Sequence, residues 1–410
     1  MGAHHPSIPL VLFDDDLGRF GPMVDLRAAF EIRTGAETTA RRVARRAGDR
    51  LACFWVPARL RAMVAERSTL PVNVLPEAPR LALLNGRLLR HDGLGDCPPD
   101  EALVEDGTGD VVAATLTRAD AEAFLRDGTL PAHVARRSSA ALRMVRRPWE
   151  ILAALETTIA HDISHDRPRE AREAAPATVV GEHPVSIERS AVLWPGVVID
   201  AEHGPVAIHE RAVVRAHATL CGPCVVGAGA TVAEQAVIRP RTVIGPMCRV
   251  GGEVSGTIFQ GFANKAHDGF LGDSYVGKWV NLGAGTTNSN LLNTYGEVSM
   301  RLAPDAPRER TGRQFLGAII GDHAKLAIGT RLMTGTTIGT GAMIATSASP
   351  PSSVPAFAWL TDDASSTSKR WRIDRFEETM RTVMARRGEE VGEAYCAAVR
   401  RVFAGTGGAS

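Results

Sequence analysis

The chain has 410 residues, and its 47 basic and 46 acidic side chains give a formal net charge of +1. That length suggests roughly two or three domains, and the balanced charge gives no overall field that would favour nucleic acid or an anionic membrane. The longest early apolar run, residues 8–13, is too short for the core of a signal peptide, and no run approaches a membrane span. We therefore expect a cytoplasmic protein with reduced structural thiols.

The first part of the chain alternates short apolar runs with segments of helical spacing. Strands are expected at 8–13, 51–57, 81–84 and 111–116, and helices at 25–47, 118–126 and 148–161. Such alternation is typical of a Rossmann-like α/β domain with a largely parallel sheet.

The middle of the chain carries a hexapeptide repeat. Every sixth residue is aliphatic in two unbroken runs: Ile208, Val214, Leu220, Val226, Val232, Ile238, Ile244 and Val250, then Ile320, Leu326, Leu332, Ile338 and Ile344. A small residue usually lies four positions after each of these. A helix of period 3.6 cannot keep every sixth residue on one face. The repeat instead predicts a left-handed parallel β-helix from about Ile187 to Ile344.

Two amphipathic helices are expected after the repeat, around residues 373–384 and 391–402. The predicted organisation is an α/β domain over 8–165, a linker over 166–176, the β-helix over 177–350 and a helical segment over 351–405.

The repeat breaks between Val254 and Leu271, where the densest polar cluster lies, residues 264–269. A histidine in such a loop, His267, can take a proton from an amine or a hydroxyl group. Glycine and alanine at 283–285 let a long ligand lie close to the backbone. A surface histidine with no chemical role explains His267 as well, and we favour the functional interpretation because the loop and the glycine-rich coil coincide.

The segment 264–286 (NKAHDGFLGDSYVGKWVNLGAGT) is similar to the acetyltransferase half of the bacterial bifunctional enzymes that make UDP-N-acetylglucosamine. Nearly the whole chain resembles a divergent branch of sugar nucleotidyltransferases with hexapeptide tails. The motifs that carry this second resemblance are Phe13-Asp14-Asp15, Leu84-Asn85-Gly86-Arg87, Pro148-Trp149-Glu150, Gly261–Gly269, Gln314–Gly317 and Val354–Trp359.

The resemblance implies roles for particular residues of the β-helix. His267 takes the place of the family's catalytic base, and Asn281 and Asn290 match its sugar-contacting asparagines. The backbone of Gly283, Ala284 and Gly285 would lie along acetyl-CoA or another acyl-CoA. Arg239 looks like the arginine that binds the substrate phosphate, and Lys265 could replace a family lysine. Phe270 stands where the family has a tyrosine, so the accepting sugar is not fixed.

The resemblance also implies a nucleotide site after the first strand, with Asn85 and Arg87 nearby. Ordinary members wrap the triphosphate in a glycine-rich, arginine-containing loop. Here Gly18, Arg19 and Gly21 could form a reduced version, with Asp15 or Asp16 holding Mg²⁺. An acidic turn and a solvated surface loop explain the same residues, so both interpretations stay open.

Three functions remain open at this stage. The favoured one is a sugar-nucleotide enzyme, expected to be a homotrimer, that transfers an acyl group to an amino-sugar phosphate or nucleotide sugar and carries a nucleotidyltransferase-like domain. Its partners would be sugar phosphate and nucleoside triphosphate, without nucleic acid or membrane. The second is a nucleotidyltransferase whose β-helix only assembles the oligomer. The third is a non-catalytic scaffold.

Overall fold

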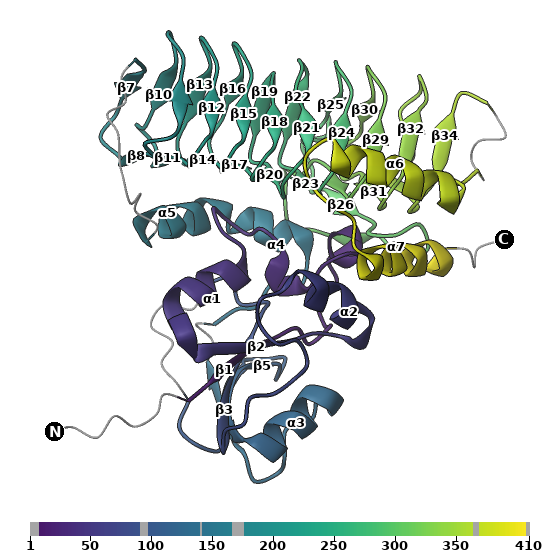
Figure 1. Ribbon diagram of the computed structural model, residues 1–410. Coiled ribbons are helices and arrows are strands. Elements are labelled where there is room, and N and C mark those ends of the chain that lie inside the picture. Colours follow the sequence, from purple (N-terminus) through teal and green to yellow (C-terminus); the bar gives the residue numbers. More distant parts are fainter. Residues whose placement is uncertain (1–7, 91–96, 140–141, 166–175, 364–368, 407–410) are drawn as a thin grey trace.

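The computed structural model describes residues 8–90, 97–139, 142–165, 176–363 and 369–406. An α/β domain lies against one side of a long β-helix, and two C-terminal helices lie beside the later coils (Figure 1). The expected linker, 166–176, falls almost wholly outside the described residues. In the described part, no helix is long and apolar enough to cross a lipid bilayer.

The N-terminal domain is built on one six-stranded sheet. Its order is β2 (Leu51–Trp55), β1 (Leu10–Phe13), β3 (Arg80–Asn85), β5 (Val111–Thr117), β4 (Glu101–Glu105) and β6 (Ala135–Ser139). Around it lie α1 (Thr39–Ala47), α2 (Ala58–Arg67), α3 (Arg118–Asp127), α4 (Pro148–Ala153) and α5 (Leu155–His165), with the short 3-10 turns η1 (Gly21–Val24), η2 (Ala29–Glu31) and η3 (Gly48–Arg50).

The sheet is mixed but largely parallel, as expected, because every strand of it except β5 runs in the same direction. β1 runs parallel to β2 and β3, whereas β5 is antiparallel to both β3 and β4. The reversal comes from a hairpin between β4 and β5, where Gly107 and Gly109 have positive φ. Because a tight hairpin can join only antiparallel strands, this pair could not form a crossover unit.

The arginine-rich stretch 25–47 is helical only from Thr39, which corrects the expected long helix. The segment before it holds only the short 3-10 turn η2 and otherwise irregular backbone, and it contacts the β-helix. The side-chain oxygen of Gln260 accepts from the backbone N–H of Arg33 at 2.8 Å, and its amide donates to the carbonyl of Glu31 at 2.8 Å. Tertiary contacts thus override local helix propensity here.

The expected left-handed parallel β-helix is confirmed, with three faces made of stacked parallel strands (Figure 1). We call the first the domain face, because the N-terminal domain lies on it. It consists of β8 (Val185–Ile187), β11 (Val206–Ile208), β14 (Cys224–Val226), β17 (Thr242–Ile244), β20 (Ile258–Phe259), β23 (Tyr275–Val276), β28 (Ile319–Ile320), β31 (Thr337–Ile338) and β33 (Ser353–Val354).

The second face is called the tail face, because the C-terminal helix α6 covers part of it. It consists of β9 (Val192–Leu193), β12 (Val213–Val214), β15 (Thr231–Val232), β18 (Arg249–Val250), β21 (Asn264–Lys265), β24 (Asn281–Leu282), β29 (Lys325–Leu326), β32 (Met343–Ala345) and β34 (Trp359–Thr361).

The third face consists of β7 (Thr178–Val180), β10 (Val198–Asp200), β13 (Thr219–Cys221), β16 (Val237–Ile238), β19 (Glu253–Ser255) and β22 (Phe270–Gly272), followed by the pair β25 (Thr287–Asn288) and β30 (Arg331–Leu332). An insertion after β25 holds the short hairpin β26 (Ser299–Met300) and β27 (Glu309–Arg310).

The aliphatic residues of both runs, which recur at every sixth position, point into the core of the β-helix, and every one of them is buried. Cys224 and Cys248 fill small inward positions, and all six cysteines are free thiols. The coils continue past residue 350, since β33 and β34 still pair with β31 and β32. Val354 and Leu360 extend the core there. The Ser/Pro-rich segment 347–355 therefore does not end the β-helix at residue 350.

The N-terminal domain is joined to the domain face by apolar and ionic contacts. Outward residues of that face, such as Val243 and Ile258, pack with Leu155 and Ile159 of α5. Arg27 forms a buried ion pair with Asp322 of the β-helix. Because charges buried together are costly to separate, this pair holds the two parts in one relative position.

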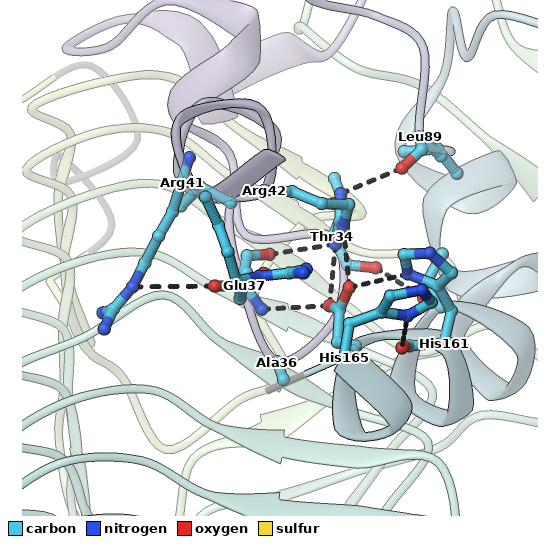
Figure 2. A network of polar contacts seen from close by, with 12 residues as sticks. Thr34, Ala36, Glu37, Arg41, Arg42, Leu89, His161 and His165 are labelled. Carbon is cyan, nitrogen blue, oxygen red and sulfur yellow. Dashed lines mark hydrogen bonds and ion pairs between the residues drawn. The ribbon is translucent and has the colours of Figure 1, made fainter. Parts of the chain in front are cut away.

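A second buried ion pair ties α1 to α5 inside the domain (Figure 2). Arg42 donates to both carboxylate oxygens of Asp162, at 2.6 and 2.7 Å, and also to the carbonyl of Leu89 at 2.9 Å. Burial alone would raise the pKa of Asp162, but the hydrogen bonds from Arg42 and His161 lower it to about 2. This carboxylate therefore stays ionised at neutral pH.

The C-terminal helices are α6 (Ile373–Ala385) and α7 (Glu393–Gly405), close to their expected positions. α7 lies between the β-helix and the N-terminal domain, where it packs against α2 (Figure 1). Glu66 of α2 accepts hydrogen bonds from the backbone N–H groups of Ala394 and Tyr395, at 2.9 and 3.1 Å. It thereby satisfies free donors at the start of α7.

Candidate functional site

His267 lies on a turn between β21 and β22, at the edge shared by the tail face and the third face. Its side chain is exposed. The turn stacks on that of the next coil, since Asn264 pairs with Asn281 and a Cβ on Gly269 would meet the carbonyl oxygen of Thr286 at 2.2 Å. Gly269 has φ +101°, so only glycine fits both this backbone and this close approach.

The predicted acyl-CoA residues, Gly283, Ala284 and Gly285, form the stacked turn itself. The turn of the following coil lies beneath it, with the N–H of Gly329 donating to the carbonyl of Ala284 at 2.7 Å. A Cβ on Gly329 would meet nothing within 4 Å, and Ile328 is 79% exposed. We call the turns 266–269, 283–286 and 327–330 the His267 corner. It is open and partly apolar, as a long thin ligand requires.

Lys265 lies beneath the turn that carries His267. Its buried ammonium group donates to the carbonyls of Gly251, His267 and Asp268 at 3.0, 3.0 and 3.1 Å. Burial lowers the pKa of Lys265 to about 8. The sequence suggested Lys265 as a substrate-binding residue, and the structure places its amine where it fixes the shape of the turn.

The other predicted acyl-site residues lie apart from His267 within one chain. Asn281 is exposed on the tail face, one coil beyond Asn264. Asn290 follows β25 at the opposite edge of the third face, and its amide donates to Asp273 at 2.8 Å. Arg239, which follows β16 at that same edge, pairs with Glu253 at 2.9 Å. A single subunit therefore does not bring all of these side chains together.

Asn281 opens into a basic pocket of about 420 Å³ between the tail face and α6. Its polar lining residues are Arg249, Asn264, Asn281, Lys325, Arg386 and Arg387. No acidic side chain is among its described lining residues. Burial lowers the pKa of Lys325 to about 8, and burial, then the neighbouring Arg249, lowers that of Arg387. Cations gathered in this way favour an anionic ligand.

The sequence did not single out this basic pocket, because its members are spread from residue 249 to residue 387. Two features of the sequence could have indicated it: Arg386-Arg387 at the end of an amphipathic helix, and a cation or amide at the same position of successive coils. Register places Arg249, Asn264, Asn281 and Lys325 in one column of the tail face.

The N-terminal candidates meet at the carboxyl ends of β1 and β3, which are neighbours in the sheet although β2 lies between them in the chain. In open α/β sheets this is the place where ligands bind. Arg87 donates to both oxygens of Asp15 at 2.8 and 2.6 Å, and Asn85 donates to Asp15 at 2.7 Å. The structure thus brings Asp15, Asn85 and Arg87 together.

Arg87 is fully buried and also pairs with Asp110 at 2.7 Å. Burial alone would lower the pKa of Arg87, but its hydrogen bonds to Asp15 and Asp110 raise it. Asp110 in turn pairs with Arg146. Asp110 and Arg146 could not be predicted from the sequence, because neither belongs to a recognisable motif.

The loop after β1 borders a cavity of about 670 Å³. Asp16 lies on this cavity and pairs with Arg59 at 2.7 Å. Arg19 is exposed farther along the loop, where its backbone N–H donates to the carbonyl of Arg146 at 2.8 Å. Among the described residues, the one group with the spacing of metal ligands is Asp100, Asp120 and His133, which does not include Asp15 or Asp16.

Comparison with known proteins agrees with the arrangement of the N-terminal domain. Residues 10–167 match the model of a family described as sugar nucleotidyl transferase. The chain is also similar to proteins named "Bifunctional protein GlmU". It is 26% identical to that of Cyanothece sp. over 200 residues, which cover 43% of this chain and 43% of the relative. It is 34% identical to that of Desulfitobacterium hafniense over 144 residues, which cover 30% and 32%.

The chain thus spans less than half of the length of these curated relatives. A search of solved structures found the acetyltransferase domain of PglB from Neisseria gonorrhoeae in complex with acetyl coenzyme A, with 13% identity and a TM-score of 0.19 over 60% of this chain and 98% of that one. The expected resemblance is confirmed: residues 10–167 match the model of the sugar nucleotidyl transferase family, and part of the chain is similar to proteins named "Bifunctional protein GlmU".

Proposed function

We propose that the protein is a transferase of sugar-nucleotide biosynthesis, in which the β-helix transfers an acyl group from acyl-CoA to an amino-sugar phosphate or nucleotide sugar. The observation that carries this proposal is the His267 corner, where an exposed histidine stands over a glycine-rich turn. The working division is a nucleotidyltransferase-like domain over 8–165, a β-helix that starts near residue 177 and continues through β34, and a C-terminal segment with the helices α6 and α7.

His267 would act as the general base. When bound, acyl-CoA supplies a thioester carbonyl, which is open to attack by an amine. His267 would take the proton from the sugar amine as the amine nitrogen forms a bond to the thioester carbonyl carbon. The carbon–sulfur bond then breaks, and the leaving sulfur takes up the proton to give the free thiol. Lys265 would be a positioning residue, because it holds the turn but points away from the exposed surface.

The basic pocket would bind the phosphate of the acceptor. Asn281 lies at its edge and can bind sugar hydroxyls, while Arg249, Arg386 and Arg387 supply positive charge. Charge-assisted hydrogen bonds from arginine to phosphate are among the stronger polar contacts in proteins. This assignment explains why cations gather on the tail face beside the predicted sugar-contacting asparagine.

The complete acyl site would form between subunits of a homotrimer. His267 and Asn290 lie on opposite edges of the third face of one chain. If both contact one acceptor, they must come from two neighbouring chains. Closed rotational assemblies repeat such a contact at every interface, so each trimer would hold three equivalent sites.

The N-terminal domain would bind nucleotide and sugar phosphate at the carboxyl ends of β1 and β3. Asp15 and Asp16, the side chains expected to hold Mg²⁺, do not fit a metal site, because Asp15 pairs with Arg87 and Asp16 pairs with Arg59. The buried ionic cluster would instead shape the wall of this cavity, to which Asp15, Asp16 and Asp110 belong.

Thiol release from acetyl-CoA, measured with a panel of hexosamine phosphates and UDP-hexosamines, tests the acyl step. We expect thiol release only when an acceptor with a free amine or hydroxyl is present. If transfer is to the amine, the N-acetylated form of the same acceptor should give no release. Pyrophosphate release from nucleoside triphosphate and sugar phosphate tests the N-terminal domain separately. Absence of acceptor-dependent thiol release across the panel would refute the acyltransferase proposal.

A further inference from the structure

A cavity of about 800 Å³ lies where the N-terminal domain, the β-helix and the start of α7 meet. It is separate from both regions discussed above. It shares with the basic pocket only Phe262 and Trp279, whose stacked rings are 4.3 Å apart between centroids. Its volume falls within the range usual for pockets that bind small molecules.

The walls of this cavity combine charged side chains with two pairs of stacked aromatic rings. Phe262 is half-buried in front of the buried Trp279. On the opposite side, Phe54 is half-buried and stacks on the buried Phe30, with 5.0 Å between ring centroids. The two exposed ring faces come from different parts of the molecule, β20–β21 of the β-helix and β2 of the N-terminal domain. A flat apolar group would be enclosed between them.

Lys278 supplies an amine that has no direct polar partner among the described residues, although Asp322 and Glu31 are near enough to act on its pKa. Its amine lies 6.0 Å from the centre of the Phe262 ring, and its stem passes Gly261. Within the described ranges, no acceptor lies within hydrogen-bonding distance of this amine and no carboxylate within ion-pairing distance. Burial, then Arg27 and Arg67, lowers the pKa of Lys278, as expected of an amine without a counter-ion.

The other charges of the cavity already have partners. Arg33 donates to the carbonyls of Gln260 and Ala36, and Arg41 lies 3.7 Å from Glu37. Arg27 pairs with Asp322, and Arg67 pairs with Glu31 at 2.6 Å. The carboxylate of Glu66 accepts the backbone N–H groups at the start of α7. Two further lining residues, Glu389 and Glu390, are exposed in the turn before α7, where water screens them. Lys278 is therefore the cation left for a ligand.

We propose that this cavity is a binding site for a small amphipathic anion, whose apolar body lies between Phe262 and Phe54 and whose carboxylate or phosphate binds Lys278. A half-buried ammonium group without a partner is costly to keep charged, and an anion in the cavity lowers that cost. The ligand would contact the N-terminal domain, the β-helix and α7 at once, and its binding would tie these three parts together.

Calorimetric titration of the full-length chain tests the proposal with three probes that share one ring: benzoate, phenyl phosphate and benzyl alcohol. We expect saturable binding of one ligand per chain for at least one anion. The uncharged alcohol should bind at least about tenfold more weakly, because a hydrogen bond to a charged group contributes about 1.5–3 kcal/mol. The stronger of the two anions identifies the natural group as carboxylate or phosphate.

Variants locate the binding. Lys278→Met should weaken binding of the anion at least about tenfold, and Lys278→Arg should retain it. Lys369→Met, which removes an exposed lysine paired with Asp363, should leave it unchanged. The double variant Arg386→Gln/Arg387→Gln should also leave it unchanged, and this separates the cavity from the basic pocket and from the acyltransferase proposal.

Ala44→Trp provides a second route, should Lys278→Met fail to fold. Ala44 is an exposed residue of α1 that lines the cavity, so a larger side chain should fill the mouth and abolish binding with Lys278 intact. The proposal is overturned if none of the anions binds saturably, if benzyl alcohol binds as well as they do, or if both Lys278→Met and Ala44→Trp leave binding unchanged.

Discussion

The roles of individual residues follow from the direction in which each side chain points. Lys265 ends β21 and His267 lies two positions later on the following turn, yet the first is buried and the second exposed. Sequence alone could not separate them, because strand alternation is lost where a coil is interrupted. The structure separates them by showing three carbonyls around the Lys265 amine.

Lys265→Met should change the turn rather than the binding of acyl-CoA. Three carbonyls lose their donor, and unsatisfied buried groups cost about 1–3 kcal/mol each at most, so the melting temperature should fall. Hydrogen exchange at residues 266–269 should become faster, and turnover should fall while acyl-CoA affinity stays constant. Lys369→Met serves as the matched control. Unchanged exchange and turnover would show that Lys265 does not position His267.

Two helices of the fold give predictions at the scale of elements. The packing of α1 on α5 depends on the buried pair Arg42 and Asp162 (Figure 2). Since the folded-state pKa of Asp162 is about 2 and its ordinary value is 3.8, the carboxylate contributes stability at pH values above about 4. That contribution, about 2 kcal/mol from the pKa difference, is lost as pH falls toward 2.

Asp162→Asn should therefore lower the free energy of unfolding at neutral pH by several kcal/mol, because it also leaves Arg42 buried without a counter-ion. The difference between wild type and variant should shrink as pH falls from about 4 to about 2. Urea denaturation at a series of pH values measures it. A difference that stays constant over that range would contradict the assigned pKa.

The end of α6 should determine the affinity for phosphate. Arg386→Gln/Arg387→Gln removes two cations from the basic pocket and should raise KM for a phosphorylated acceptor by about tenfold or more, with little change in kcat. Arg375→Gln is the matched control, since Arg375 lies on the same helix but is exposed and pairs with Glu378. Equal effects of the two substitutions would place the acceptor phosphate elsewhere.

How far the sequence predicts the elements depends on whether their contacts are local. The β-helix could be predicted, because each inward position repeats after six residues and Ile208 to Val250 need no distant partner to reveal it. The irregular segment before α1 could not be predicted, because its conformation depends on contacts with Gln260 of the β-helix. The basic pocket could not be predicted for the same reason, because the residues at the end of α6 are far in sequence from the tail-face residues that they approach in the fold.

At the scale of the whole molecule, the separation of His267 from Asn290 predicts a site shared between chains. His267→Ala and Asn290→Ala should each be inactive, but mixing the two after unfolding and refolding together should restore part of the activity. Some interfaces of the mixed trimers would then combine an intact His267 with an intact Asn290. Light scattering should give about three times the chain mass of 43.7 kDa. A monomer mass, or no restored activity, would contradict the shared site.

The central claim is that His267 is the general base of acyl transfer, and turnover of His267→Ala tests it most directly. A general base typically contributes ~10²–10⁴-fold in rate, so thiol release with the best acceptor should fall by that order. Acetyl-CoA affinity and melting temperature should hardly change, because the side chain is exposed and outside the core. If His267→Ala keeps the turnover of the wild type, the proposed mechanism is wrong.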